Sequence, residues 1–512
     1  MRQGLQGAAA EGGQFVLDAG RDLGVDRAPD QAVVLQAAQG LGERLGADAL
    51  QFAAQLAEAA RAVRQGGDGE ARPLVDEQLE DRAARAEQAV DVVPGLGERV
   101  IVGLTSHGSQ NIVGLLAGNR AVRSTVPIMK STAASATVAS VPFPVRVGIV
   151  GLSARGGWAS RSHLPALARL KGYELRALSA SSEASARAAG AEYGVPLAFG
   201  STEELVRSDQ VDLVVVSVRV PLHREAALAA LGAGKAVLCE WPLGNGLAEA
   251  EELAAAADRA GVRTFVGLQA RSAPAVRHVR ELVADGYVGE VLSTTMVASG
   301  RGWGPVFEPS GAYLLDERNG ATMLTIPFGH TIDGLTMALG EFTEVSATLA
   351  TRRPVVREAG TGRTAAMTAA DQIAVSGRLE SGAVATAHFR SGLSRGTDFH
   401  WEINGTEGDL VVTGDSGHLQ QAALTVRGGR GADQGLTELP VPARHFDVTE
   451  LTELRGLPSY EVAYNVGAQY ARILTDLTEG TAHAPDFAHA VRRQRLLDAI
   501  GRSAATGRRV AV

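Results

Sequence analysis

The segment from residue 145 to residue 268 alternates between short apolar runs and amphipathic stretches, and this alternation restricts the fold more than any other feature of the chain. The first run, Val145 to Val150, ends at a glycine and is typical of a buried parallel strand. Strands that alternate with helices predict a parallel sheet with right-handed crossovers. We expect strands at 145–150, 173–178, 211–218, 236–239 and 264–268, with a helix after residue 156 and others at 182–193, 223–232 and 247–260.

Beyond residue 288 the pattern changes, because apolar segments are now joined by short turns such as Glu380-Ser-Gly. Hairpin connections of this kind predict a mostly antiparallel, open sheet. The chain is therefore expected to be α/β, with a parallel-sheet domain at 143–268 followed by an α+β domain at 269–512. In the second domain we expect strands at 291–298, 345–351, 373–379, 383–389, 399–403 and 410–412, and helices at 462–477 and 487–499.

The turn Gly151-Leu-Ser153-Ala-Arg155-Gly156 follows the first expected strand and opens a helix. In a Rossmann-type domain a glycine-rich turn at this point lets backbone N–H groups hold the diphosphate of a dinucleotide. Ser153 stands where the usual pattern has its middle glycine, and Arg155 could add charge to a phosphate contact. Alone the turn could be an ordinary strand-to-helix connection, but the strand–helix repeats behind it favour nucleotide binding.

The end of the second expected strand bears on which nicotinamide cofactor is bound. NAD-selective sites usually place an acid there to hold the ribose hydroxyls. Here the residues are small, Ser179-Ala-Ser181-Ser182, and the first acid is Glu183. Room for a 2′-phosphate slightly favours NADP over NAD, although a plain turn would have the same composition.

Residues 1–142 have a different texture. Before Lys130 the chain has no Lys, Trp, Tyr or Cys, and its only aromatic residues are Phe15 and Phe52, so it lacks the large side chains that dominate core burial. Residues 31–64 show a helical pattern. Three interpretations stay open: a small helical domain, a disordered or loosely helical extension, and a true start at Met129. No function is assigned to this segment.

Composition excludes several classes of function. The net charge is -8 with a pI near 5.8, so a basic nucleic-acid surface is not expected. Cys239 is the single cysteine, which rules out intramolecular disulfides and cysteine-rich zinc sites, and no metal site is expected. No apolar run approaches the roughly 20 residues that span a bilayer. We therefore expect a cytoplasmic protein.

Three further segments carry a family resemblance. The strand at 211–218 is followed by Arg219-Val-Pro-Leu-His223, and 233–243 resembles the motif Gly-Lys-x-Val-x-x-Glu-Lys-Pro of the glucose-fructose oxidoreductase and inositol dehydrogenase family (Gfo/Idh/MocA). The segment 401–408 resembles a turn in the second domain of that family. On these motifs, residues 143–505 are identified as a member of this family. The resemblance implies hydride transfer between a nicotinamide and a sugar, polyol or related hydroxy compound.

The resemblance also implies a Lys after the Glu, an Asp on a later helix and a His four residues beyond it as the proton-transfer groups. This sequence departs at two of those positions, since Trp241 replaces the Lys and Ile326 replaces the Asp, while His330 and Asp333 match. His330 is expected to accept a proton because histidine titrates near physiological pH. The alternative is a helix-borne histidine whose hydrogen bonding is satisfied by Asp333.

Two functions follow from these residues. The first is an NAD(P)-dependent oxidoreductase that uses His330. The second is a redox-silent dinucleotide-binding regulator acting through protein contact, because Glu240-Trp-Pro resembles a branch of the family that contains the yeast repressor of the galactose pathway. The resemblance also implies a homodimer or homotetramer formed through the C-terminal sheet.

The candidate site residues fall into three groups. Catalytic roles are assigned to His330 and Asp333. Substrate contacts are expected from Trp241, His330, Arg301 and Trp303, the last two in a glycine-rich loop. The cofactor is expected beside Gly151, Ser153, Arg155, Gly156, Ser181, Ser182, Ser217, Val218, Pro221, His223, Glu240, Trp241 and Gln269.

Overall fold

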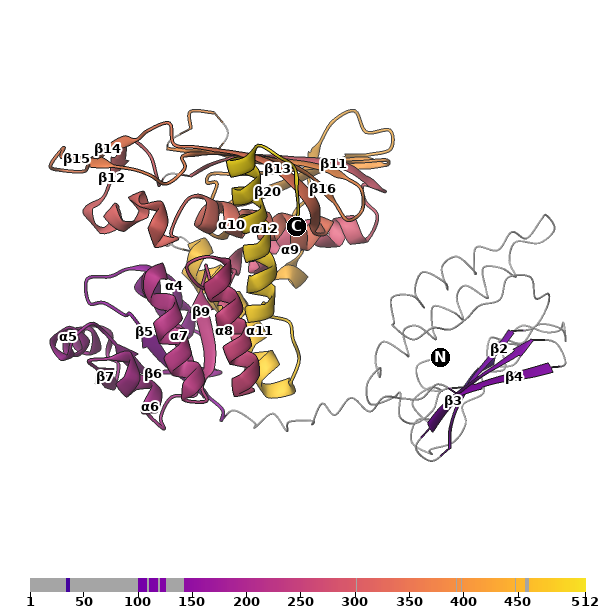
Figure 1. The fold of residues 1–512 in the computed structure, drawn as a ribbon, viewed down its shortest axis with the longest axis horizontal. Helices are drawn as coiled ribbons and strands as arrows, with labels where there is room; N and C mark the ends of the chain where they lie inside the picture. The colour runs from indigo at the N-terminus through magenta and orange to yellow at the C-terminus, as the bar shows by residue number, and fades with distance from the viewer. Residues whose placement is uncertain are drawn as a thin grey trace. The chain divides into compact units, whose positions relative to one another are not determined.

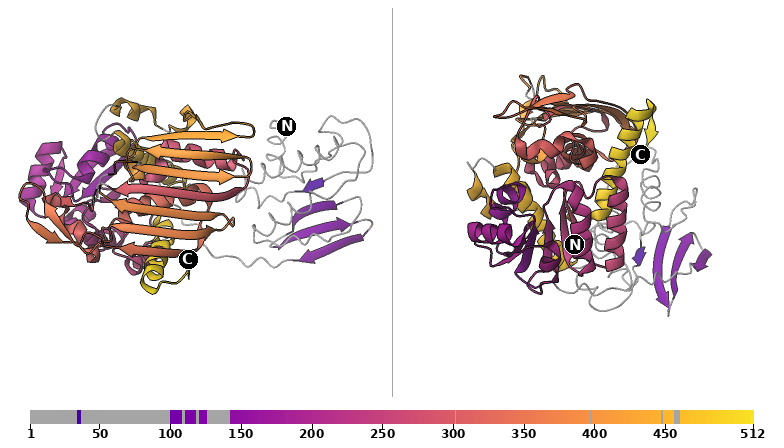
Figure 2. Two further views of the ribbon diagram at one scale, coloured as in Figure 1. Left: turned by 90° about the horizontal axis from the view of Figure 1, so that it is seen from above. Right: turned by 60° about the vertical axis from the view of Figure 1, so that its left-hand side comes forward.

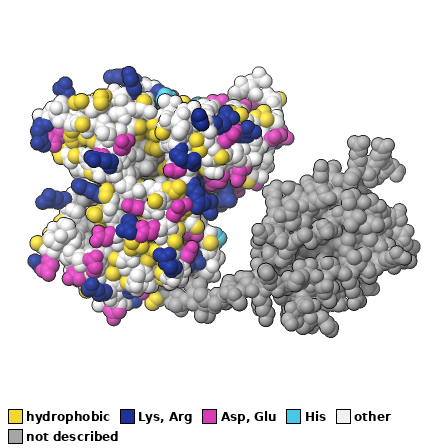
Figure 3. All heavy atoms as spheres, in the orientation of Figure 1, with side chains coloured by type: hydrophobic (Ala, Val, Ile, Leu, Met, Phe, Trp, Pro, Cys, Tyr) yellow, Lys and Arg dark blue, Asp and Glu magenta, His cyan; other side chains and the backbone are white. Residues whose placement is uncertain are grey.

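The computed structural model describes residues 142–512 except 301, 393, 397, 447 and 456–459, together with the strand backbones at 34–36, 100–107, 110–117 and 120–125 (Figure 1). The chain divides into two compact units, Met1–Thr137 and Val138–Val512. Among the described residues, no helix combines the length and the apolar character that crossing a lipid bilayer requires. Figure 3 shows acidic and basic side chains interspersed over the visible face of the second unit.

The described part of the first unit is a four-stranded sheet, in the order β1-β2-β3-β4. Strand β1 (Val34–Gln36) pairs in parallel with β2 (Val100–His107), and β2, β3 (Gln110–Ala117) and β4 (Arg120–Thr125) pair antiparallel. The helix predicted over 31–64 is therefore wrong at β1; the rest of that helix lies outside the described residues. The sequence offered a signal that we missed, because β-branched residues recur through 100–117 and only Gly108 and Ser109 separate β2 from β3.

A six-stranded sheet, parallel throughout, begins the second unit and confirms the predicted Rossmann-type fold. Its order is β10-β9-β8-β5-β6-β7, so the direction of the strand order reverses between β5 and β8. Ligands of such sheets bind at the carboxyl ends of the strands at this switch point. The strands are β5 (Val145–Val150), β6 (Tyr173–Ser179), β7 (Leu197–Phe199), β8 (Leu213–Val216), β9 (Ala236–Glu240) and β10 (Thr264–Gly267).

Both faces of this sheet are buried, which explains the continuous apolar runs. Ile149 and Val215 belong to one hydrophobic core, whereas Val150 and Val214 belong to another on the opposite face. The covering helices are α4 (Trp158–Leu167), α5 (Glu183–Tyr193), α6 (Thr202–Arg207), α7 (His223–Gly232) and α8 (Leu247–Ala260). Strand β7 and helix α6 were not predicted, since both are short and partly exposed.

The C-terminal part is built on a nine-stranded sheet, in the order β21-β20-β19-β18-β11-β17-β16-β13-β22 (Figure 2). All neighbours pair antiparallel except β11 and β17, which confirms a mostly antiparallel sheet. The strands are β11 (Val291–Gly300), β13 (Phe342–Ala350), β16 (Gln372–Leu379), β17 (Val384–Ser391), β18 (Phe399–Gly405), β19 (Gly408–Gly414), β20 (Leu424–Arg430), β21 (Thr437–Glu438) and β22 (Val510–Ala511). A small sheet of β12 (Val306–Phe307), β14 (Val355–Glu358) and β15 (Thr364–Ala366) lies beyond it.

Helices cover one face of the nine-stranded sheet (Figure 2). Along β17, exposed and buried side chains alternate, as expected for a strand with one face on the core. The helices are α9 (Pro274–Ala284), α10 (Gly329–Leu339), α11 (Tyr460–Glu479) and α12 (Phe487–Thr506). Helix α11 packs on α4, and α12 runs along both α8 and β13 (Figure 1). The two last helices therefore join the parallel-sheet part to the antiparallel part.

One fully buried cation on α12 anchors this junction. The guanidinium of Arg493 is 0% exposed; its Nε donates to Asp333 on α10 at 3.2 Å and its Nη2 donates to Glu341 at 2.8 Å. Asp333 also accepts from Arg271 and contacts His489 at 2.7 Å. A buried carboxylate is tolerated only when cations and donors surround it, so these contacts fix α10 relative to α12.

Replacement of this cation is expected to destabilise the protein. Arg493→Met leaves Asp333 buried with fewer cationic partners, and should lower the free energy of unfolding by about 3–5 kcal/mol. Arg495→Met is the matched control, because Arg495 lies on the same helix but pairs with Glu251 at the surface. That change should cost less than about 1 kcal/mol. Urea unfolding measures both, and equal effects of the two changes would contradict the anchoring role.

Candidate functional site

The glycine-rich turn after β5 touches the end of β8 at the switch point. Gly151 has φ +95°, and a Cβ there would lie 2.7 Å from the carbonyl oxygen of Ser217 and 2.6 Å from Cγ1 of Val218. Only glycine fits this conformation and this approach. The turn thus brings three of the predicted cofactor residues together at the carboxyl edge of the sheet.

The rest of the turn leaves backbone donors at the start of α4. Tyr193 donates to the carbonyl of Ser153 at 2.9 Å, and the N–H of Gly156 donates to the same oxygen at 3.0 Å. The residue before α4, Gly157, supplies no capping side chain. The side chain of Arg155 is exposed next to the turn. Uncapped N–H groups and a nearby guanidinium form an arrangement suited to a phosphate.

Ser181 and Ser182, at the end of β6, are exposed. Ser182 caps α5, since its hydroxyl accepts from the N–H of Ser185 at 3.2 Å. Glu183, the first acid after the strand, is 3.0 Å from Arg187 and is therefore paired locally. The end of the second strand consequently presents two hydroxyl residues without a free carboxylate.

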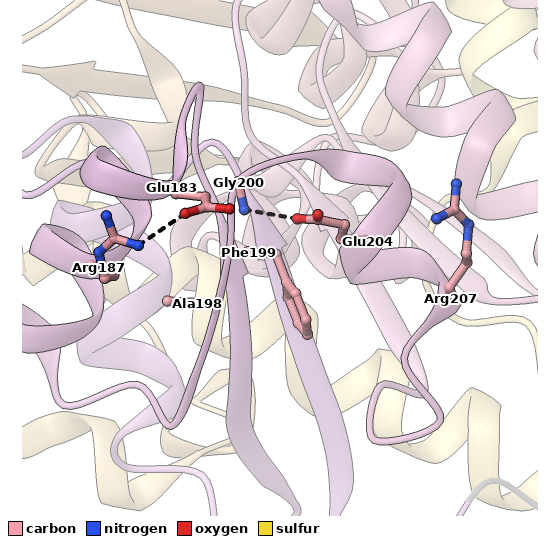
Figure 4. Close-up of a pocket in the computed structure, with 7 residues that line it drawn as sticks. All are labelled: Glu183, Arg187, Ala198, Phe199, Gly200, Glu204 and Arg207. Atoms are coloured by element: carbon pink, nitrogen blue, oxygen red, sulfur yellow. Dashed lines mark hydrogen bonds and ion pairs between the residues drawn. The ribbon is translucent and has the colours of Figure 1, made fainter.

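A pocket adjoins this point at the outer edge of the parallel sheet (Figure 4). Glu183 faces Arg187 across its rim, and the N–H of Gly200 donates to Glu204 at 3.0 Å. The lining residues come from α5, β7, the turn after β7 and α6, and they are Glu183, Arg187, Ala198, Phe199, Gly200, Glu204 and Arg207.

Pro221 is exposed, whereas His223 is buried beneath the loop after β8. The two ring nitrogens of His223 lie 2.8 Å from the carbonyl of Pro242 and 3.0 Å from that of Val218. Burial lowers the pKa of His223. Its contacts join the ends of β8 and β9, so it positions the loop that carries Val218.

Glu240, at the end of β9, belongs to a buried chain of polar groups. Its carboxylate accepts from Gln269 Nε2 at 2.8 Å and lies 3.1 Å from His163 Nε2. The other ring nitrogen of His163 contacts the hydroxyl of Tyr470 at 2.8 Å. The chain links α4, β9 and α11. His163 and Tyr470 were not predicted, because nothing in the sequence places residues so far apart together.

Trp241 packs its ring against the start of α10 and is 4% exposed. Its indole N–H donates to the carbonyl of Thr325 at 2.6 Å, and a Cβ on Gly329 would lie 2.7 Å from the same nitrogen. The carbonyl is available because a π-helical turn, Leu324–Phe328, precedes α10 and Gly329 bonds to Ile326 instead. Ile326 itself packs against the core. The two departures from the family pattern are thus neighbours at one turn, because Trp241 bonds to Thr325, the residue before Ile326.

His330 begins α10 and is 3% exposed. Burial, with the neighbouring His418, lowers the pKa of His330 to about 3, so the ring is neutral at physiological pH. The expectation that it titrates near neutrality is therefore corrected. Its Nδ1 has no hydrogen-bond partner among the described residues.

Asp333 does not serve His330 as a partner, so the predicted alternative of a histidine satisfied by Asp333 is also corrected. Its carboxylate contacts Arg271, His489 and Arg493. Burial raises the pKa of the carboxyl, but Arg271, the contact with His489 and Arg493 outweigh burial and hold the pKa below its usual value. The geometry makes Asp333 a structural anion in the described state.

Trp303 and His418 lie close to one another with their rings stacked, the centroids 6.5 Å apart. The indole of Trp303 is buried and donates to the carbonyl of Leu314 at 2.8 Å. Burial lowers the pKa of His418 to about 4. Arg301 lies outside the described residues. His418 was not predicted, since it follows β19 in a loop with no motif.

Comparison with known proteins supports the family resemblance. Residues 145–268 match the oxidoreductase family with an NAD-binding Rossmann fold, and residues 274–414 match the C-terminal domain of Gal80p. The galactose/lactose metabolism regulatory protein GAL80 of Kluyveromyces lactis is 30% identical over 319 residues, 57% of this chain and 70% of that protein. The chain belongs to the Gfo/Idh/MocA family. Within this family it falls in the Gal80-like branch.

Both dehydrogenases and regulators are similar to this family member. Dehydrogenase AclE of Aspergillus oryzae is 39% identical over 209 residues, which are 40% of this chain and 57% of AclE. The crystal structure of a super-repressor mutant of Gal80p from Saccharomyces cerevisiae superimposes with a TM-score of 0.66 at 25% identity, covering 72% of this chain and 98% of that one. The chain is therefore an NAD-binding oxidoreductase family member.

Acid is expected to destabilise the fold through the two buried histidines. The depressed pKa values of His330 and His418 lie below the value of about 6.5 in an unfolded chain. The unfolded state therefore binds more protons below that pH, and stability present above about pH 6.5 is lost as the pH falls toward about 4.

The measurement is urea unfolding at pH values between about 7 and about 4.5. In the parent, the free energy of unfolding falls as the pH is lowered. His418→Gln should make this slope smaller by up to about 1.4 kcal/mol per pH unit. His400→Gln is the control, because the side chain of His400 is 34% exposed. An unchanged slope in His418→Gln would show that this ring does not titrate on unfolding.

Proposed function

We propose that the protein binds a nicotinamide dinucleotide at the switch point and uses it in hydride transfer with a sugar, polyol or related hydroxy compound. The carrying observation is the contact of Gly151 with Ser217 and Val218, which aims the uncapped start of α4 along the carboxyl edge of the sheet. A bound nicotinamide would supply the hydride acceptor or donor. The match to an NAD-binding family over 145–268 supports the proposal.

Residues of this chain would position the substrate more than they would exchange protons with it. Neutral His330 can accept a hydrogen bond from a substrate hydroxyl through Nδ1, which has no protein partner among the described residues, once the side chains that bury this atom move aside. Its low pKa makes it a weak base, and Trp241 offers no ammonium to lower the pKa of that hydroxyl. Loss of a general acid–base group typically lowers a rate by about 100- to 10,000-fold. We infer slow turnover, with its proton transfer assisted by His330.

A second candidate is a regulator that binds the dinucleotide without redox turnover. The observation that favours it is the buried hydrogen bond from Trp241 to Thr325, which fills the position of the family lysine with a fixed apolar ring. Similarity to the GAL80 regulatory proteins supports it. In this function the domain junction would respond to the dinucleotide and present a surface to a protein partner.

We further propose that the protein is a cytoplasmic homodimer or homotetramer. The exterior face of the nine-stranded sheet carries exposed apolar side chains such as Leu292 and Val384, 52% and 56% exposed. Pairing of this face with a second copy would remove them from water.

NADP is expected to bind more tightly than NAD, because Ser181 and Ser182 leave room for a 2′-phosphate. Ser182→Asp keeps a good helix cap but places a carboxylate where that phosphate would lie, so the affinity for NADP should fall at least about tenfold relative to NAD. Calorimetry with both cofactors measures this. Gly151→Ala is the control that should abolish binding of both, and equal affinities before and after Ser182→Asp would contradict the assignment.

Turnover separates the two functions. NADH or NADPH is offered with a panel of ketoses, inososes and ketoacids, and we expect oxidation of the cofactor that falls at least about 100-fold in His330→Ala. Cofactor affinity of the variant, measured by calorimetry, controls for folding. The rate should show no inflection from His330 above about pH 5, because its neutral form is already complete there.

Absence of oxidation across the panel, with cofactor binding retained, would support the regulator instead. The double variant Trp241→Lys, Ile326→Asp restores the two family residues. Turnover by this variant would show that the rest of the junction can support hydride transfer. Unchanged turnover in His330→Ala would remove this residue from the mechanism.

A further inference from the structure

Two histidines and a glutamate gather away from the dinucleotide site. His278 and Glu281 lie one helical turn apart on α9, and His445 ends the short helix η7 (Ala443–His445). One possible ligand atom from each lies within 4.8 Å of the other two. No motif in the chain points to this cluster, because η7 is far from α9 in the sequence.

Two buried imidazoles of the cluster lie beside one carboxylate. His278 and His445 are 5% and 6% exposed, and Nδ1 of His278 has no hydrogen-bond partner among the described residues. Nε2 of His445 lies 2.5 Å from Oε2 of Glu281 and forms an ion-pair contact with it. Buried polar atoms are rarely left without a partner, so the unpaired nitrogen of His278 next to this His–Glu pair calls for a ligand such as a cation.

We propose that His278, Glu281 and His445 bind a zinc ion. Two imidazoles and one carboxylate are a known three-ligand zinc set, which leaves a fourth position for water or another ligand. With zinc–ligand distances of about 2.0–2.2 Å, tetrahedral ligand atoms lie about 3.3 Å apart. His445 and Glu281 would therefore separate slightly on binding, while the more distant ligand atoms, which lie within 4.8 Å of one another, would draw together.

Charge around the cluster sets its affinity. Imidazoles ligate zinc in their neutral form, so binding competes with protonation of both rings. Arg444 competes, since its guanidinium contacts both oxygens of Glu281 at 2.9 Å. Arg277 donates to the carbonyl of His445 at 3.0 Å and adds a second positive charge nearby.

The ion would fasten α9 to the segment that follows β21. This clamp lies beneath the antiparallel sheet and uses none of the residues assigned to the dinucleotide or the substrate. It therefore stands or falls independently of the proposed function.

Zinc titration of the full chain, stripped with a chelator, tests the site. We expect saturable binding of one zinc ion per chain at this cluster. His278→Ala and His445→Ala should each weaken that binding at least about 100-fold, the upper end of the effect of outer-shell changes. His400→Ala is the matched control, since His400 also lies beside a carboxylate, Glu402, at 3.3 Å. It should bind zinc like the parent.

Arg444→Gln keeps all three ligands and removes a positive charge that repels the zinc ion and competes for Glu281, so affinity should rise by roughly tenfold. This variant tests the site even if an alanine variant fails to fold. Unfolding temperature should rise with zinc in the parent and in Arg444→Gln, and not in the two histidine variants. No saturable binding by the parent, equal binding by His278→Ala, or weaker binding by Arg444→Gln would overturn the proposal.

Discussion

The contact between the turn after β5 and the end of β8 governs the rest of the structure. Because the strand order reverses between these strands, the two helices that follow them leave to opposite sides and open the edge between. A side chain at Gly151 would occupy the space of Ser217 and Val218. The same approach that packs the sheet tightly therefore also exposes the backbone donors at the start of α4. Both the packing of the turn and the exposure of these donors therefore depend on the absence of a side chain at Gly151.

The replacement of a lysine by Trp241 changes the chemistry of the junction between the two sheets. The ring packs on Gly329, and its N–H is used by Thr325, so a mobile charge gives way to a fixed apolar surface. The same apolar surroundings keep His330 neutral. Asp333, meanwhile, is held by two arginines and by His489, and it fastens α10. Retention of a family residue is thus no guarantee that it keeps a family role.

The parallel sheet could be predicted because both of its faces are buried, so each strand is a plain apolar run between turns. Helices α7 and α8 have the predicted bounds, and glycines follow closely at their ends. The antiparallel sheet was visible through its turns. Short elements with partly exposed residues, such as β7, contain too few apolar positions to be predicted from their periodicity. The strands at 100–125 were missed because composition was weighed above the recurrence of β-branched residues.

The candidate site was less predictable, since its geometry depends on pairs that are distant in sequence. The turn at Gly151 is local, and its residues could be named from the chain alone. The partners of Glu240, His330 and Asp333 come from α4, the loop after β19 and α12, and no motif links them. The residue types were therefore predictable, while their protonation and hydrogen bonding depended on the fold.

The segment after β11 packs beside His418, a neighbour of His330 at the junction between the two sheets. Trp303 adopts φ 54°, a left-handed conformation that costs an aromatic residue on the order of 1–3 kcal/mol. Its bond to Leu314 and its stacking on His418 offset that cost. A ligand that reached His330 would have to displace buried rings on this side, and displacement of Trp303 would release its backbone strain. Trp303 is thus held in a strained backbone conformation by the contacts of its buried side chain, and His418 connects it to the surroundings of His330.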